Sequence, residues 1–137
     1  MIKLEIKQLI KKALCAREYA YAPYSEFRVG AAVLCSDGSV FTGANIENVS
    51  LGAANCAERT AIFKAVSEGK RSFEAIAVAS DMDRLIYPCG ICRQVLAEFK
   101  VPVVIAADNK GNYRVYKSEE LLPHAFIEFH TSKEKRK

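Results

Sequence analysis

The sequence predicts an α/β fold in which helices cover the faces of a mixed sheet. Apolar residues recur at helical spacing in segments 3–20 and 58–68, and a hairpin signal stands between these two segments. Further along, two apolar runs of strand length flank a third helical segment. A strand, a helix and a second strand in this order make a parallel crossover. The sheet is therefore expected to be antiparallel at the hairpin and parallel further in.

The first half of the chain is expected to hold two helices and the hairpin. An amphipathic pattern predicts a helix over 3–20. Segments 29–35 and 40–46 are rich in apolar residues that favour strands, and the Asp37-Gly38 pair between them is typical of a tight hairpin turn. The next helix is predicted over 58–68, with its start near Cys56.

The second half is expected to complete the sheet. Segments 73–80 and 101–107 are continuous apolar runs, which are typical of buried strands. A helix is predicted between them over 91–99, an edge strand over 112–116 and a short helix over 118–122. Because no linker or repeat divides this pattern, one domain is expected over residues 1–130.

Charge and hydropathy exclude several classes of protein. The formal net charge is +4, of which the last five residues supply +3, so residues 131–137 are expected to form a flexible basic tail on a nearly neutral domain. A nucleic-acid partner is not expected, because no basic stripe interleaved with aromatic residues is present. There is also no apolar run of membrane-spanning length and no signal-peptide pattern, which predicts a cytoplasmic protein without a membrane partner.

The five cysteines point to a metal site. An odd number of thiols in a reducing compartment favours metal binding or catalysis over disulfides. Cys56 stands at the predicted start of one helix, and Cys89 and Cys92 stand at the start of the next. Helix N-termini favour thiolates. Three thiolates would fill three of the four tetrahedral positions around one Zn²⁺ ion and leave the fourth open for water, as in catalytic zinc sites.

The carboxylate of Glu58 completes the pattern. It stands two residues after Cys56, where it is expected to take a proton from the zinc-bound water and return it to the leaving group. The general signature of zinc deaminases is a zinc-binding His or Cys with a Glu two residues later, followed further along the chain by Pro-Cys-x-x-Cys. The alternatives are a redox Cys-x-x-Cys pair and a closed structural zinc site. A redox pair does not demand the third cysteine, and a structural site would need a fourth ligand, whereas Cys15 and Cys35 are expected to be small buried residues.

Over nearly the whole domain the chain resembles the small homotetrameric cytidine deaminases with three zinc-binding cysteines. The resemblance extends from the Tyr21-Ala22-Pro23-Tyr24-Ser25 motif to Leu121-Leu122-Pro123. Its most specific stretches are Phe27-Arg28-Val29-Gly30-Ala31-Ala32, Asn45-Ile46-Glu47-Asn48, Asn55-Cys56-Ala57-Glu58-Arg59-Thr60-Ala61 and Pro88-Cys89-Gly90-Ile91-Cys92-Arg93-Gln94.

The resemblance implies a three-layer α/β/α fold with a mixed sheet of about five strands, and one zinc ion per chain. It also implies hydrolytic deamination of cytidine and deoxycytidine, in which the activated water attacks C4 of the pyrimidine while Glu58 protonates N3 and then the departing amine. A cytosine-containing antibiotic as substrate, deamination of a base in nucleic acid, or a non-catalytic zinc-binding protein are the alternatives. The last of these would be expected to have lost a ligand or Glu58.

Roles for further residues follow from the same resemblance. Phe27 is expected to pack against the pyrimidine, and Asn45 and Glu47 are expected to bind the 3′-hydroxyl of the sugar. The peptide groups of Ala57 and Ser80 are expected at the edge of the base.

Three more positions concern the zinc ion and a neighbouring subunit. Arg59 is expected to offset the negative charge of three thiolates on zinc. Phe126 is expected to reach the active site of a neighbouring subunit, so that the active sites of the tetramer are shared. At Leu51 the family usually has an aromatic residue, so a hydroxyl contact near the sugar is expected to be missing here.

Overall fold

The computed structural model describes residues 1–128, in which five strands form one sheet and four α-helices pack around it. The predicted tail over 131–137 lies outside the described residues. The strands are β1 (Val29–Cys35), β2 (Val40–Ala44), β3 (Phe73–Ser80), β4 (Val103–Ala107) and β5 (Tyr113–Lys117). The helices are α1 (Lys3–Arg17), α2 (Ala57–Ser67), α3 (Gly90–Glu98) and α4 (Ser118–Leu121), with a 3-10 turn at Leu51–Ala53.

The sheet is mixed, as predicted, and its strand order is β2-β1-β3-β4-β5. Strand β1 is antiparallel to both β2 and β3, and β5 is antiparallel to β4. The predicted parallel pairing is found between β3 and β4, and helix α3 connects these two strands. Helix α2 carries the chain from β2 past β1 to β3, and this is why β3 pairs with β1 in the antiparallel direction.

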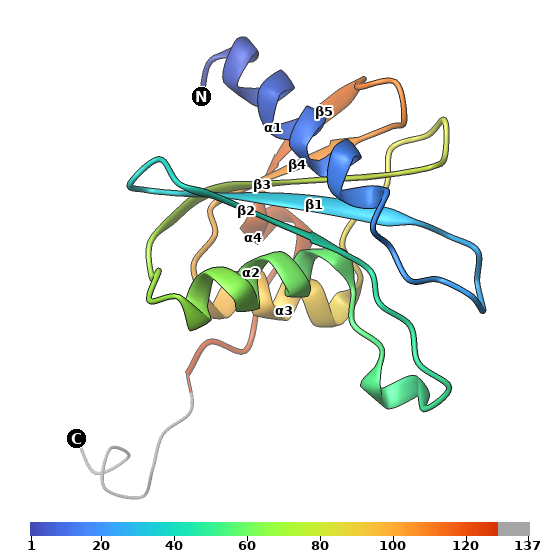
Figure 1. Ribbon diagram of the computed structural model, residues 1–137. Coiled ribbons are helices and arrows are strands. Elements are labelled where there is room, and N and C mark those ends of the chain that lie inside the picture. Colours follow the sequence, from blue (N-terminus) through green and yellow to red (C-terminus); the bar gives the residue numbers. More distant parts are fainter. Residues whose placement is uncertain (129–137) are drawn as a thin grey trace, which may run out of the picture.

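The predicted three layers are present (Figure 1). Helix α1 covers one face of the sheet, and α2 and α3 cover the other. Alternate residues of β1 face the two layers, so that Ala31 and Val33 pack with Ile62 and Leu96, whereas Ala32 packs with the apolar side of α1. The predicted α/β/α architecture with five strands is therefore confirmed.

Some boundaries differ from the prediction. Strand β4 begins at Val103 instead of residue 101, because Pro102 has no N–H to donate to a ladder. Helix α1 ends at Arg17 instead of residue 20, and strand β2 ends at Ala44 instead of residue 46. Within residues 1–128, no helix has the length and apolar character needed to cross a bilayer.

The prediction that Cys15 is buried is wrong, whereas Cys35 is buried as expected. The face of α1 that packs on the sheet carries Ile6, Leu9, Ile10, Ala13 and Ala16. One residue is a turn of about 100° around a helix. Cys15 is therefore rotated away from Ala16 and lies on the solvent side of this face.

Two glycines let helices approach the sheet closely. A Cβ atom at Gly30 would lie 1.9 Å from the carbonyl oxygen of Ala13 in α1, and one at Gly43 would lie 2.5 Å from the backbone nitrogen of Ala61 in α2. Both neighbours are helix backbone and cannot rotate aside. These glycines thus set the distance of α1 from β1 and of α2 from β2.

The Gly30→Ala variant is expected to lower the free energy of unfolding by about 3 kcal/mol, because its methyl group would push α1 off β1. Chemical denaturation of the variant and the parent protein measures this difference. Gly52→Ala is the control, since a Cβ atom at Gly52 meets no atom of the described part of the chain within 4 Å. Equal stability of the Gly30 and Gly52 variants would contradict the close approach.

Candidate functional site

Three cysteine sulfur atoms gather where the N-termini of α2 and α3 meet. Cys56 is the N-cap residue of α2, Cys89 is the N-cap residue of α3, and Cys92 lies in the first turn of α3. All three Sγ atoms lie within 4.8 Å of one another, and those of Cys56 and Cys89 are 3.7 Å apart. The structure therefore brings together the three cysteines that the sequence selected.

The geometry of this cluster fits a tetrahedral zinc ion. Zn–S bonds of about 2.3 Å at tetrahedral angles place neighbouring sulfur atoms about 3.8 Å apart. The Cys56–Cys89 separation agrees with this value. Among residues 1–128, the cluster that could hold a metal consists of these three cysteines, which leaves one of the four tetrahedral positions without a ligand from this part of the chain. Cys56, Cys89 and Cys92 are thus the residues that could hold a zinc ion with an open position.

Hydrogen bonds within the cluster favour the thiolate form of Cys56. Hydrogen bonds from Cys92 and from Arg59 lower the pKa of Cys56 to about 5. The bond to the Cys56 thiolate and burial both raise the pKa of the Cys92 thiol. A divalent cation favours the deprotonated form of every thiol that it binds, so metal binding would release protons from this cluster.

Glu58 lies beside the cluster in the first turn of α2 and is only 4% exposed. Its burial removes water from the carboxylate and raises its pKa to about 7, and the negative charge at Cys56 adds to the rise. A carboxyl group with this pKa exchanges protons readily near neutral pH, as a general acid and base must.

The Arg59 side chain runs back toward the sulfur atoms. Its Nη2 donates a hydrogen bond to Sγ of Cys56 at 3.3 Å. Its Nε is buried and has no hydrogen-bond partner among residues 1–128. The positive charge of Arg59 therefore lies directly against the thiolate side of the cluster.

The segment 45–47 is held next to the cysteines by backbone pairing. Ile46 and Asn55 exchange N–H···O bonds of 2.8 and 2.9 Å, one residue before Cys56. Ile46 also lies in a parallel bridge with Tyr21, which brings the segment before β1 to the same place. This pairing brings Asn45 and Glu47, the predicted sugar-binding residues, close to the three cysteines.

Both of these side chains bind the backbone of the segment before β1, and Asn45 also binds the first residue of β1. Asn45 Nδ2 donates to the carbonyl oxygen of Phe27 at 2.7 Å, and Asn45 Oδ1 accepts from the N–H of Val29 at 2.8 Å. Glu47 Oε1 accepts from the N–H groups of Tyr24 and Ser25 at 3.0 and 3.1 Å. Glu47 Oε2 accepts from the Ser25 hydroxyl. This bond is the largest cause of the lowered pKa of Glu47, and the two backbone bonds lower it further.

The other residues predicted to contact the nucleoside differ in their exposure and in their hydrogen bonds. Ala57 is fully buried at the start of α2, and Phe27 is 36% exposed. The carbonyl oxygen of Ser80, at the end of β3, accepts from Arg17 Nη1 at 3.0 Å, so the peptide group expected at the base has a partner within the protein. Phe126 is 66% exposed, and its carbonyl oxygen accepts from the side chain of Gln94.

Several residues that shape this region were not found by sequence reasoning. Ser25 bonds Glu47, and Arg17 fixes the end of β3. Arg93 donates to the carbonyl oxygens of Pro88 and Leu121 at 2.7 and 2.8 Å and so anchors the loop before Cys89. Their local signal was a place inside or near the family motifs, whereas Glu47, Ser80 and Leu121, which they bind, lie more than twenty residues away in the sequence.

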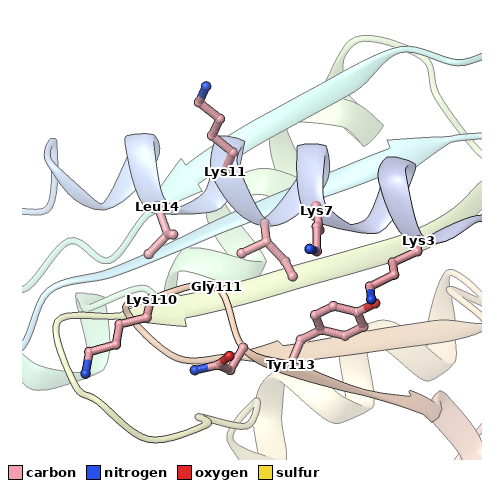
Figure 2. Close-up of a pocket in the computed structure, with 9 residues that line it drawn as sticks. Lys3, Lys7, Lys11, Leu14, Lys110, Gly111 and Tyr113 are labelled. Carbon is pink, nitrogen blue, oxygen red and sulfur yellow. The ribbon is translucent and has the colours of Figure 1, made fainter.

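A cavity of about 750 Å³ lies elsewhere, along α1 (Figure 2). Its lining comes from helix α1, the β4–β5 turn and the start of β5, and it includes Lys3, Lys7, Lys11, Lys110 and Tyr113. It is on the α1 face of the sheet, whereas the cysteines lie at α2 and α3 on the opposite face. The cavity is therefore separate from the three-cysteine cluster.

Comparison with known proteins agrees with this geometry. Residues 4–108 match the model of the cytidine and deoxycytidylate deaminase zinc-binding region. The chain is 54% identical over 126 residues to a cytidine deaminase of Halalkalibacterium halodurans, covering 90% of this chain and 95% of that protein. A probable cytidine deaminase of Dictyostelium discoideum is 48% identical over 124 residues, covering 89% and 84%.

Solved structures show the same likeness. The crystal structure of cytidine deaminase from Burkholderia pseudomallei superimposes with a TM-score of 0.84 at 48% identity, covering 92% of this chain and all of that one. The corresponding enzyme of Mycobacterium tuberculosis gives a TM-score of 0.78 at 36% identity, covering 92% and 98%. With its three clustered cysteines and the adjacent buried glutamate, the chain belongs to the zinc-binding cytidine and deoxycytidylate deaminase family.

Proposed function

We propose that this protein hydrolyses cytidine and deoxycytidine to uridine and deoxyuridine, with water consumed and ammonia released. The observation that carries the proposal is the buried Glu58 carboxyl beside three sulfur atoms that lie within 4.8 Å of one another. The high identity to proteins named cytidine deaminase over most of the chain supports the same substrate class.

In the proposed site, Cys56, Cys89 and Cys92 hold one Zn²⁺ ion per chain. When bound, zinc lowers the pKa of a water ligand and supplies a nucleophile near neutral pH. Glu58 accepts one proton of the attacking water and delivers it to N3 of the pyrimidine. Its carboxylate then takes the remaining proton from the hydroxyl group on C4 and passes it to the amine, which leaves as ammonia when the C4–N bond breaks. Its raised pKa supports this alternation, because a carboxyl group that titrates near 7 can both give and take a proton.

The nucleoside itself would be held by residues on both sides of the cluster. Phe27 packs against the pyrimidine, and the peptide group of Ala57 meets the edge of the base. Asn45 and Glu47 bind the 3′-hydroxyl of the sugar. Their position beside Asn55 supports this role, and the lowered pKa of Glu47 keeps it an ionised acceptor for a hydroxyl.

We further propose a homotetramer in which Phe126 reaches the active site of a neighbouring subunit. Large apolar side chains that remain exposed support such contacts: Val49 is 80% exposed, Leu51 81% and Phe126 66%. Leu51 lies in the 3-10 turn at Leu51–Ala53, where it would offer an apolar contact without a hydroxyl group. A light-scattering mass equal to one monomer would contradict this assembly.

We also propose that the protein is a single domain and acts in the cytoplasm in pyrimidine salvage. A single domain over residues 1–130 is supported by one sheet that carries both core clusters. A cytoplasmic enzyme of pyrimidine salvage is supported by five cysteines that all remain free thiols. The reaction would return the pyrimidine of reclaimed nucleosides to the uridine form.

The direct test is incubation of the zinc-loaded protein with cytidine, deoxycytidine, adenosine and a short cytosine-containing oligonucleotide. Absorbance change and released ammonia are followed with and without a strong chelator. We expect turnover of the two pyrimidine nucleosides alone, and loss of that turnover with the chelator. No turnover of either pyrimidine nucleoside by the zinc-loaded protein would overturn the proposal, and turnover of the oligonucleotide would move the substrate class to nucleic acid.

The Arg59→Met variant is expected to lower kcat by about 10-fold while zinc content stays near one per chain. Three thiolates give zinc a formal net charge of −1, and loss of the guanidinium at Cys56 leaves that charge on the site. Steady-state kinetics and metal analysis measure the two quantities. Arg84→Met, at an exposed position, is the control. Unchanged kcat in the Arg59 variant would remove Arg59 from the proposed site.

A further inference from the structure

The segment before β1 is tied to the Glu47 carboxylate by three hydrogen bonds. The N–H groups of Tyr24 and Ser25 donate to Oε1 at 3.0 and 3.1 Å, and the Ser25 hydroxyl donates to Oε2. The carboxylate is therefore engaged on both oxygen atoms by residues more than twenty positions earlier in the chain. This arrangement fixes the carboxylate and the segment relative to each other.

The Ser25 hydroxyl has a second partner. Its Oγ accepts a hydrogen bond from the N–H of Phe27 at 3.0 Å while it donates to Glu47. One hydroxyl group thus joins the Glu47 carboxylate to the backbone of Phe27. From the other side, Asn45 Nδ2 donates to the carbonyl oxygen of Phe27 at 2.7 Å. Side chains therefore hold both polar backbone groups of Phe27.

The backbone between Ser25 and Phe27 has an uncommon conformation. Glu26, between Ser25 and Phe27, has a φ of +58°, in the left-handed region that residues with a Cβ atom rarely adopt. Such a conformation persists only where the surroundings enforce it. Phe27 is also 36% exposed and belongs to neither of the two core clusters of the described residues, so core packing contributes little to holding its ring.

We propose that Ser25 is a positioning residue that couples the sugar-binding carboxylate of Glu47 to the ring of Phe27. The inference rests on the proposed function, because it gives Glu47 and Phe27 their roles toward the nucleoside. In this arrangement, the ring that packs on the pyrimidine takes its place from the same carboxylate that meets the sugar. Ser25 touches neither the base nor the reacting atoms.

The test begins with Ser25→Ala, which removes both bonds of the hydroxyl. We expect kcat/KM for cytidine to fall about 10-fold, mainly through KM, because the lost bonds hold binding groups and one of them is to a charged group. Ser25→Thr keeps a hydroxyl group and should restore kcat/KM to within about 2-fold of the parent protein. A parent-like kcat/KM for Ser25→Ala would overturn the proposal.

Ser39→Ala is the matched control. Ser39 Oγ also donates to a carboxylate, Asp37 Oδ1 at 2.6 Å, but in the β1–β2 turn. This variant loses the same kind of bond and should keep the parent kcat/KM. An equal loss in the Ser39 and Ser25 variants would show a general effect on folding and would contradict the positioning role.

Two further arms test the coupling to Phe27. With 2′,3′-dideoxycytidine, which has no 3′-hydroxyl, the loss in Ser25→Ala should persist, because the displaced ring still meets the base. With the same dideoxy substrate, the effect of Ser25→Ala in a Phe27→Leu background should fall below about 2-fold, since Phe27 is then the binding group through which Ser25 acts. Loss confined to substrates with the hydroxyl, or additive effects of the two substitutions, would overturn the coupling.

A measurement without substrate separates this inference from the proposed function. Hydrogen exchange of the zinc-loaded protein should show faster exchange of the Phe27 amide in Glu47→Ala, although Glu47 does not bond that amide directly. Unchanged exchange would contradict the link through Ser25 even if cytidine is turned over. Faster exchange in a protein that fails to turn over cytidine would leave the link standing and reject the proposed substrate.

Discussion

Glu58→Gln is expected to lower kcat for cytidine by about 100- to 10,000-fold while the protein keeps one zinc ion per chain. The amide has nearly the shape of the carboxyl group, but it can neither accept the protons of the attacking water nor pass them to N3 and the departing amine. Because the carboxyl group is buried, with its pKa raised to about 7, the neutral amide suits the same surroundings. The free energy of unfolding should therefore not decrease.

Steady-state kinetics, metal analysis and thermal unfolding of the same preparation separate these effects. The control is Glu68→Gln at the C-terminal end of α2, where the side chain is exposed and far along the helix from Cys56. Parent-like kcat in the Glu58 variant would remove this residue from the chemistry. If the variant lost zinc together with activity, Glu58 would instead have a role in zinc binding.

Cys56→Ala is expected to abolish both zinc binding and deamination. Two remaining thiols cannot fill the three protein positions of the site, and the variant also loses the sulfur atom that Arg59 contacts. Zinc content measured after dialysis should fall from about one per chain to near zero. The thermal midpoint should also move toward that of the chelator-treated parent protein, because a ligand that binds the folded state stabilises it.

Cys15→Ala is the matched control, since it removes one thiol at an exposed position in α1. It should retain about one zinc per chain and the parent kcat. If Cys56→Ala kept its zinc, the three-cysteine ligand set would be wrong. If Cys15→Ala lost zinc, a further thiol would have to be added to the set.

Individual turns, strands and helix starts could be predicted where neighbouring residues alone determine them. The Asp37-Gly38 turn, the apolar run of β3 and the helix starts at Cys56 and Cys89 lie within a few residues of their predicted places. The burial of Cys15 was predicted wrongly, because a single cysteine in an amphipathic helix does not indicate which edge of the apolar face it occupies. That decision depends on how α1 is rotated against β1.

The pairing of β1 with β3 was also beyond the sequence. The pattern predicted a hairpin and a parallel crossover, but it did not show that β3 would lie beside β1 in the antiparallel direction. Strand order depends on where helix α2 crosses the sheet, and Gly43 fixes the contact of α2 with β2 through the absence of a side chain. Such contacts join residues that are distant along the chain.

The sequence by itself determined the chemistry of the candidate site. Three cysteines at two helix starts and a glutamate two residues after the first are local features, and their order along the chain was enough to indicate zinc and a proton-transfer carboxylate. The tertiary structure decided the geometry, which includes the 3.7 Å between Cys56 and Cys89 and the bonds that join Glu47 to Ser25. Residue types fix which bonds are chemically possible, whereas long-range packing fixes which atoms come close enough to form them.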